Sequence, residues 1–328
     1  MAPFSPLADL PSEIILEVLA FAACSSKKTA IALTYVSSWV KHATAPYVYA
    51  TVILRSARQI NAFLALIRQH DGSPNGKHIV NPAPFVRNIC ITHHAPWRPQ
   101  GEGTETDPYG VIFSSCTNVR HAALQSTFLH SSLVPHHPVH RLRCNELMVL
   151  GPTFPSDWEK HAEASAPRVL SLDGGDDIDP NEAREEHNET GASVLQHTTH
   201  LRLLESLSSP QFSGPHLTLL PRLTHLALLI REQIYSTNPF TELDPLLASP
   251  QLRMVVVSFD FRTWVDKKRG LDDWAKLARK VDDRLFAVER DRGDPLKHWA
   301  RAVHGGDDIW SRAVREQTDR DSRKTVAV

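Results

Sequence analysis

Features that mark secreted, metal-binding and membrane proteins are scarce in this chain of 328 residues. Its four cysteines lie far apart, at positions 24, 90, 116 and 144, so they form no disulfide framework and favour a reduced protein of the cytoplasm or nucleus. Neither Cys-Xaa-Xaa-Cys nor His-Glu-Xaa-Xaa-His occurs, and we expect no metal site. The apolar stretch 14–23 is short, contains Glu17 and follows no basic segment, so we expect neither a signal peptide nor a membrane partner.

The charge balance and the absence of catalytic motifs argue against two further classes. The 36 lysines and arginines are interleaved with 37 acidic residues, so no basic stripe is available and we expect no nucleic-acid partner. The phosphate-binding, dinucleotide-binding and Gly-Xaa-Ser-Xaa-Gly motifs are missing, so we expect no cofactor, no catalytic residue and no enzyme. The nearest motif, 304–307, is similar to the glycine-rich oxyanion loop of lipases but is better interpreted as a turn between helices. An unrecognised hydrolase is the alternative.

The N-terminal segment has a distinct apolar pattern. Leu10-Pro11-Ser12-Glu13 is followed by apolar residues spaced three and four apart, and a proline fits the first turn of a helix, so a short amphipathic helix is predicted here. A second apolar run begins at 31, is interrupted at 37–38 and stops before Pro46, which predicts two more short helices packed on the first.

The order Leu-Pro-Xaa-Glu and then Val-Ser-Xaa-Trp, at 36–39, resembles an F-box over residues 10–54, and the continuation through 51–64 is similar to a fungal group of F-box-like proteins. The resemblance implies a non-catalytic substrate receptor that links an unknown target protein to a Skp–cullin–RING ubiquitin ligase. The adaptor contacts that it implies are Leu10, Pro11, Ile14, Ile15, Leu19, Val36 and Trp39. The loop 24–28 lacks the proline and acidic residue usual in the family. The alternative is therefore an interaction scaffold that has lost adaptor binding.

A loose repeat of the form apolar-x-x-apolar-x-apolar recurs from residue 86 onward. Its units are 86–91, 119–124, 144–149, 167–172, 198–203, 223–228 and 252–257. Subtracting successive fourth positions (89, 122, 147, 170, 201, 226 and 255) gives spacings of 33, 25, 23, 31, 25 and 29, close to those of leucine-rich repeats. We therefore expect an α/β (α+β) fold in which the F-box-like helical module leads into a degenerate leucine-rich-repeat-like solenoid with a C-terminal helical cap. An ordinary α/β sheet domain is the alternative.

The predicted boundaries are 6–54 for the helical module, 55–85 for a linking strand and helix, 86–262 for the solenoid, 263–315 for the cap and 316–328 for a flexible tail. Alternation along each predicted strand places the third, fifth and seventh positions of a unit on the open face of the sheet. Because curved solenoids commonly bind partners on their concave side, we expect this face to hold the target protein. Its candidate residues are His121, Gln125, Glu146, His200, Arg202, His225 and Met254.

Overall fold

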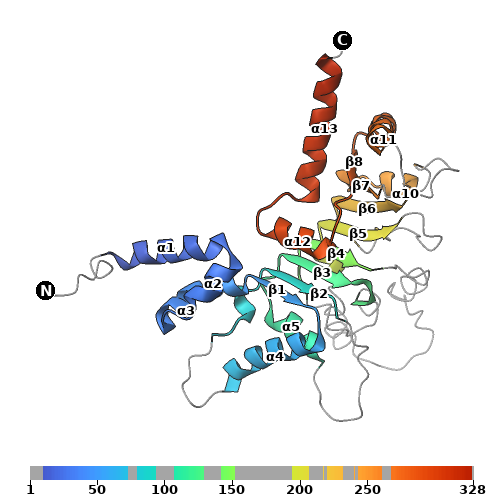
Figure 1. Cartoon of the computed structure of the whole chain (residues 1–328). Coiled ribbons are helices and arrows are strands. Elements are labelled where there is room, and N and C mark those ends of the chain that lie inside the picture. Colours follow the sequence, from blue (N-terminus) through green and yellow to red (C-terminus); the bar gives the residue numbers. More distant parts are fainter. Residues whose placement is uncertain are drawn as a thin grey trace, which may run out of the picture.

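Figure 1 presents a computed structural model of the chain. The structure describes residues 10–72, 80–93, 107–128, 142–151, 194–206, 217, 220–231, 240, 243–260 and 267–326. The predicted repeat unit 167–172 lies outside these residues.

In the described part of the chain, three helices precede the sheet, others lie between its strands, and two follow the last strand. The helices before the sheet are α1 (Ser12–Ser25), α2 (Lys27–Leu33) and α3 (Ser38–Tyr49). The strands are β1 (Thr51–Leu54), β2 (Asn88–Ile91), β3 (His121–Gln125), β4 (Glu146–Leu150), β5 (His200–Ser206), β6 (His225–Arg231), β7 (Met254–Asp260) and β8 (Leu285–Glu289). The other described helices are α4 (Ala57–Gly72), the 3-10 turn η1 (Ala83–Phe85), α5 (Pro108–Ser115), α9 (Val194–His197), α10 (Asp244–Leu247), α11 (Lys267–Val281), α12 (Pro295–Val303) and α13 (Ile309–Val326).

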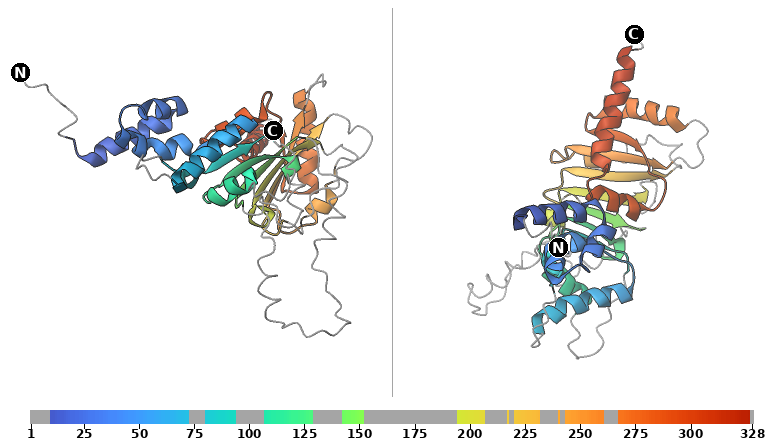
Figure 2. Two further views of the ribbon diagram at one scale, coloured as in Figure 1. Left: turned by 90° about the horizontal axis from the view of Figure 1, so that it is seen from below. Right: turned by 60° about the vertical axis from the view of Figure 1, so that its left-hand side comes forward.

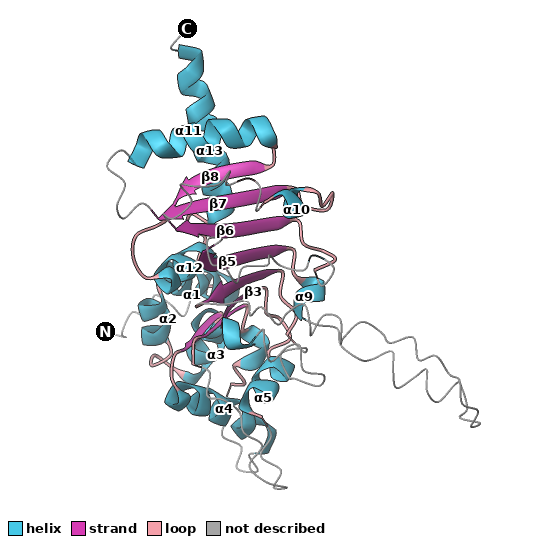
Figure 3. Ribbon diagram, turned by 90° about the vertical axis from the view of Figure 1, so that its right-hand side faces the viewer, coloured by secondary structure: helices cyan, strands magenta, loops and turns pink. Residues whose placement is uncertain are grey.

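The eight strands form one sheet in which every neighbouring pair is parallel and the spatial order follows the chain from β1 to β8. Figure 3 shows these strands stacked as successive rungs. Parallel neighbours require a crossover between them, and α4, α5, α10 and α11 lie in these connections.

Both faces of the sheet are covered, which explains why its strands are apolar on both sides. The larger core lies on the face that we call the outer face. There, alternate strand residues such as Ile89, Leu201 and Val255 pack on side chains of α4, α5 and α11, and the opposite face is the inner face. On the inner face, Trp299 of α12 packs on Cys90, Ala123 and Met148. The start of α13 contributes Ile309, Trp310 and Ala313, which pack on Ala227, Met254, Val256 and Val288.

The predicted fold class is therefore wrong. The chain does not form a small helical module followed by a leucine-rich-repeat-like solenoid with a helical cap. It forms a single eight-stranded parallel α/β sheet that begins at Thr51 and ends at Glu289. The sheet crosses the predicted boundaries, because β8 lies in the segment assigned to the cap, and α12 and α13 cover a face instead of an end. The repeat pattern predicts only where the parallel strands lie along the chain. It contains no information on the helices that cover the inner face of the sheet.

α1 and α3 begin close to where the sequence indicates, whereas α2 begins at Lys27, ahead of the apolar run at 31. The hydroxyl of Ser26 accepts a hydrogen bond from the backbone N–H of Thr29 at 3.0 Å and caps α2, and Ser37 caps α3 through the N–H of Val40 at 3.2 Å. The prediction that the last helix stops before Pro46 is wrong, since α3 continues to Tyr49. The buried face of α3 extends through Thr44 and Ala45, so packing outweighs the one hydrogen bond that the proline removes.

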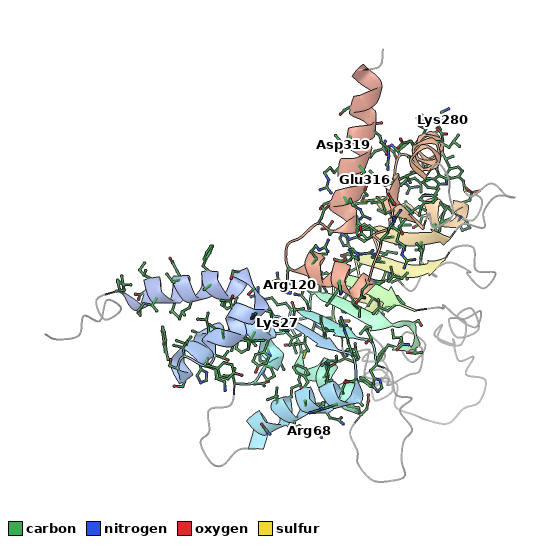
Figure 4. All side chains as sticks on the ribbon, in the orientation of Figure 1. Lys27, Arg68, Arg120, Lys280, Glu316 and Asp319 are labelled. Atoms are coloured by element: carbon green, nitrogen blue, oxygen red, sulfur yellow. The ribbon has the colours of Figure 1, made fainter. Side chains whose placement is uncertain are left out.

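Both edges of the sheet are occupied by side-chain cations. The ammonium of Lys27, which lies where α2 meets the sheet in Figure 4, donates to the carbonyl of Thr51 in β1 at 2.8 Å. At the other edge, Arg320 and Arg312 of α13 each donate at 2.9 Å to carbonyls of β8, those of Ala287 and Glu289. These contacts block strand addition at the two edges. They also explain why α13 runs to Val326, where the sequence predicted a frayed tail after residue 315.

Candidate functional site

Two regions contain the predicted site residues, and the first is the N-terminal helical region. In the left view of Figure 2, α1–α3 project from the β1 end of the sheet. The three helices contact one another through few and small buried side chains: α1 buries Ala23 alone, α2 buries Ala30, and α3 buries Val40, Thr44 and Ala45. Small residues at the helix contacts leave the large apolar side chains outside.

The exposed apolar side chains of these helices are large. Phe21 is 82% exposed and Tyr35 is 85% exposed, and the remainder of the set is Leu10, Ile14, Leu16, Val18, Ile31, Val36 and Trp39. Ile14, Val18 and Phe21 follow one another at intervals of four and three, so they form one stripe along α1. We call the exposed set the N-terminal apolar surface. Monomeric soluble proteins seldom leave large apolar patches uncovered, so the stripe on α1 is a candidate binding surface.

The predicted adaptor contacts lie on or beside this surface. Leu10, Pro11, Ile14, Val36 and Trp39 are exposed, and Ile15 and Leu19 are half-buried. The adaptor contacts implied by the resemblance include neither Phe21 nor Tyr35, the two most exposed side chains of this surface. The sequence could have indicated this exposure, because α1 carries apolar residues on nearly every side and a short helix cannot bury all of its sides.

The loop that departs from the F-box pattern has structural roles. Ser26 caps α2, and Lys27 holds the first strand through the carbonyl of Thr51. Burial lowers the pKa of the Lys27 ammonium. Cys24 is exposed. The residues that replace the usual proline and acid therefore anchor α2 to the sheet.

The second region is the inner face of the sheet, where five of the seven predicted target-facing residues form one row. The strand register aligns His121 with Glu146, Glu146 with His200, His200 with His225, and His225 with Met254. Arg202 lies one row further along β5, while Gln125 lies at the end of β3. Met254 is buried, and the other members of the row are half-buried.

The inner face is not an open surface, because α13 packs against this row. The imidazoles of His200 and His225 are stacked with their centroids 4.1 Å apart, and the indole of Trp310 meets them edge-on at 5.3 and 5.6 Å. Nδ1 of His121 lies 2.8 Å from the side-chain oxygen of Asn88, and its Nε2 lies 3.7 Å from a carboxylate oxygen of Glu146. Sequence reasoning missed Trp310 as the side chain that closes this row.

Burial sets the ionisation of the row. Burial and the neighbouring His225 lower the pKa of His200 to about 4, and burial with Arg253 nearby lowers the pKa of His225. Burial and Arg120 likewise lower the pKa of His121. Burial and the charge of Asp308 raise the pKa of the Glu146 carboxyl. The three imidazoles are therefore neutral at physiological pH.

Within the described ranges, no group of three or more His, Cys, Asp or Glu side chains is placed to hold a metal ion. Burial raises the pKa of Cys90, Cys116 and Cys144 to about 12 each, so these thiols are poor nucleophiles at neutral pH. No helix in the described part of the chain is both long and apolar enough to cross a bilayer.

No protein-family model matches the chain, and a search of curated proteins finds no match to its sequence.

Proposed function

We propose that the protein is a non-catalytic substrate receptor that docks onto a Skp-family adaptor of a cullin–RING ubiquitin ligase through the N-terminal apolar surface. The observation that carries the proposal is the exposure of large apolar side chains on helices whose mutual contacts use small ones. The Leu-Pro-Xaa-Glu and Val-Ser-Xaa-Trp segments that resemble an F-box supply part of this surface, through Leu10, Val36 and Trp39.

The energetics favour a protein partner over water at this surface. Burying a large apolar side chain that is now exposed contributes about 1.5–3 kcal/mol. Several such side chains are rigidly held on short helices, so docking costs little additional conformational entropy. The surface also projects away from the sheet, which leaves room for an adaptor beside it (Figure 1).

Adaptor capture by the purified full chain tests the proposal. Leu10→Asp and Val36→Asp place a charge on the surface without disturbing a core, since Leu10 is 45% and Val36 67% exposed. We expect each to weaken co-purification of a Skp-family adaptor by at least about tenfold, because a buried unpaired carboxylate is costly at an interface. Leu277→Asp is the matched control, since Leu277 is an exposed leucine on α11.

The result also separates the proposal from the scaffold alternative. A folded wild-type chain that captures no adaptor would contradict receptor function and favour a scaffold that keeps the helices without this partner. The structural roles of Ser26 and Lys27 in the atypical loop favour testing that alternative directly. Equal capture by wild type and Val36→Asp would show that the adaptor binds elsewhere.

A further inference from the structure

Exposed arginines gather at the end of the sheet where its strands begin. Arg87, Arg120 and Arg253 directly precede β2, β3 and β7, and Arg143 and Arg222 stand three residues before β4 and β6. All five are exposed, and Arg120 is labelled in Figure 4. These arginines lie far apart along the chain, and the parallel order of the strands brings them to one end of the sheet. We call the five residues the basic band.

Backbone hydrogen bonds fix the spacing of the basic band. The N–H of Arg120 donates to the carbonyl of Arg87 at 2.7 Å, and the same ladder crosses the starts of β4, β5 and β6. It ends at the N–H of Arg253, which donates to the carbonyl of Thr224 at 2.8 Å. Neighbouring strands lie about 4.8 Å apart, so the basic band is about 24 Å long from β2 to β7.

The guanidinium groups of the basic band have no ionic partner among the described residues. None of the five forms an ion pair or a side-chain hydrogen bond there. The four residues before each of the strands β2–β7 include neither Asp nor Glu. In the middle of the band, burial and then the charges of Arg143 and Arg222 lower the pKa of His197, so both arginines act on the start of β5. The band is therefore open to an anionic partner.

The described carboxylates that border the basic band leave it positively charged. Glu146 begins β4, and Asp308 at the start of α13 lies within electrostatic range of it. Beyond β7, Asp282 and Asp283 precede β8, and Asp282 pairs with Arg284 at 2.7 Å. When Arg284 is counted with the band, six cations face these four carboxylates, so two positive charges remain.

We propose that the basic band binds an extended acidic segment of the target protein. An extended chain rises about 3.3 Å per residue, so a segment of about seven residues matches the length of the band. Guanidinium groups bind carboxylates through paired, charge-assisted hydrogen bonds. Because the arginines are exposed, the segment reaches them without displacing any part of the fold. The inference rests on the proposed receptor function and names the feature of the target that is recognised.

The basic band suits an acidic peptide better than a nucleic acid. Single-stranded nucleic acids bind through rows of aromatic rings on which their bases stack. Phe85 is the only Phe, Tyr or Trp in the four-residue segments before β2–β7, and it is half-buried. Nucleic acids also gain affinity by having many phosphates neutralised, whereas the excess here is two positive charges. A short run of carboxylates needs no more than this.

Fluorescence anisotropy of a labelled hepta-glutamate peptide titrated with the full chain tests the proposal. We expect saturable binding that weakens as salt is added, and no binding of hepta-glutamine. Arg120→Gln and Arg253→Gln should each weaken binding by about two- to fivefold, and their effects should multiply in the double variant. Arg58→Gln is the matched control, since Arg58 is an exposed arginine at the start of α4, beyond the opposite end of the strands. It should leave binding unchanged.

Thermal melting of the variants provides the folding control, and because two arginines are tested, a folding defect in one variant leaves the other informative. A wild-type chain that does not bind hepta-glutamate would overturn the proposal, including the case in which the chain's own acidic segment 173–189 fills the band. Equal weakening by Arg58→Gln, or tighter binding of a thymidine oligonucleotide of the same charge, would overturn it as well. The assay contains no adaptor, so its outcome is independent of whether the N-terminal apolar surface binds one.

Discussion

The N-terminal helices and the sheet treat their apolar residues in opposite ways. In α1–α3 the small side chains are buried and the large ones are exposed, with Phe21 and Tyr35 the extreme cases. In the sheet, both faces are closed by helices, and large side chains such as Phe113 and Phe128 are fully buried. One region leaves its large apolar side chains uncovered, while the other buries them.

The difference teaches where stability and binding reside. The sheet is the part whose packing holds the fold, because helices cover both of its faces and bury strand side chains on each. The exposed apolar side chains of α1–α3 add little to the stability of the fold, because they remain in water. Matched substitutions in the two regions test whether their contributions to stability differ in this way.

Two matched phenylalanines give the largest expected contrast. Phe113 of α5 is 1% exposed and meets the ring of Phe128 at a centroid distance of 6.3 Å, whereas Phe21 is 82% exposed. We expect Phe113→Ala to lower the free energy of unfolding by about 3–5 kcal/mol, because it removes packing and leaves a cavity. Phe21→Ala should change it by no more than about 0.5 kcal/mol. Urea denaturation measures both, and comparable losses would refute the contrast.

The anchoring of α13 gives a smaller effect. Arg320 pairs with Asp272 at 3.1 Å and with Glu316 at 3.1 Å while it donates to the carbonyl of Ala287 at the sheet edge. Figure 4 shows Glu316 on the side of α13. Arg320→Met should lower the free energy of unfolding by about 1.5–3 kcal/mol, because it breaks charge-assisted hydrogen bonds and removes the guanidinium partner of Asp272, while Glu316 keeps its ion pair with Arg312.

Arg292 is the matched control for that change. Its ion pair with Glu289 spans 3.8 Å and its side chain is 78% exposed, so solvent screens it. Arg292→Met should leave the free energy of unfolding nearly unchanged in the same urea series. An Arg320 variant that is as stable as the Arg292 variant would mean that α13 does not depend on its edge contacts.

Sequence reasoning located the strands better than it assigned their surroundings. The units around Ile89, Leu147 and Val255 coincide with β2, β4 and β7, because an apolar-x-apolar alternation depends only on the strand itself. β8 was missed, since Leu285–Glu289 is a short strand among helical segments with no unit of the repeat. The cover of the inner face by α12 and α13 depends on contacts remote in sequence, which no local pattern reports.

The candidate sites show that the sequence also failed to predict which residues are covered by other segments. His200 and His225 were expected on an open face, and they lie under Trp310. The apolar or polar character of a residue identified the element and the face. It did not identify the neighbouring segment that covers the face, because that depends on how distant parts of the chain pack.

The stacked histidines His200 and His225 predict that the free energy of unfolding depends on pH through the covered inner face of the sheet. In the folded chain the pKa of His200 is lowered to about 4 from 6.5, and the pKa of His225 is lowered too. Below about pH 6.5 these histidines therefore bind more protons in the unfolded chain than in the folded chain. Their contribution to the free energy of unfolding is fully present above that pH and is lost as the pH falls toward 4. Asp308 opposes the shift at His200, and the raised pKa of Glu146 acts in the opposite direction.

Replacing one member of the stack tests this directly. His200→Phe keeps an aromatic ring beside His225 and Trp310 but takes up no proton, so it should reduce the slope of unfolding free energy against pH by at most about 1.4 kcal/mol per pH unit between pH 6.5 and 4. Urea denaturation at a series of pH values measures the slope. His304→Gln, at an exposed histidine after α12, is the control and should leave it unchanged. An unchanged slope in His200→Phe would mean that acid destabilisation, where it occurs, arises outside the closed inner face.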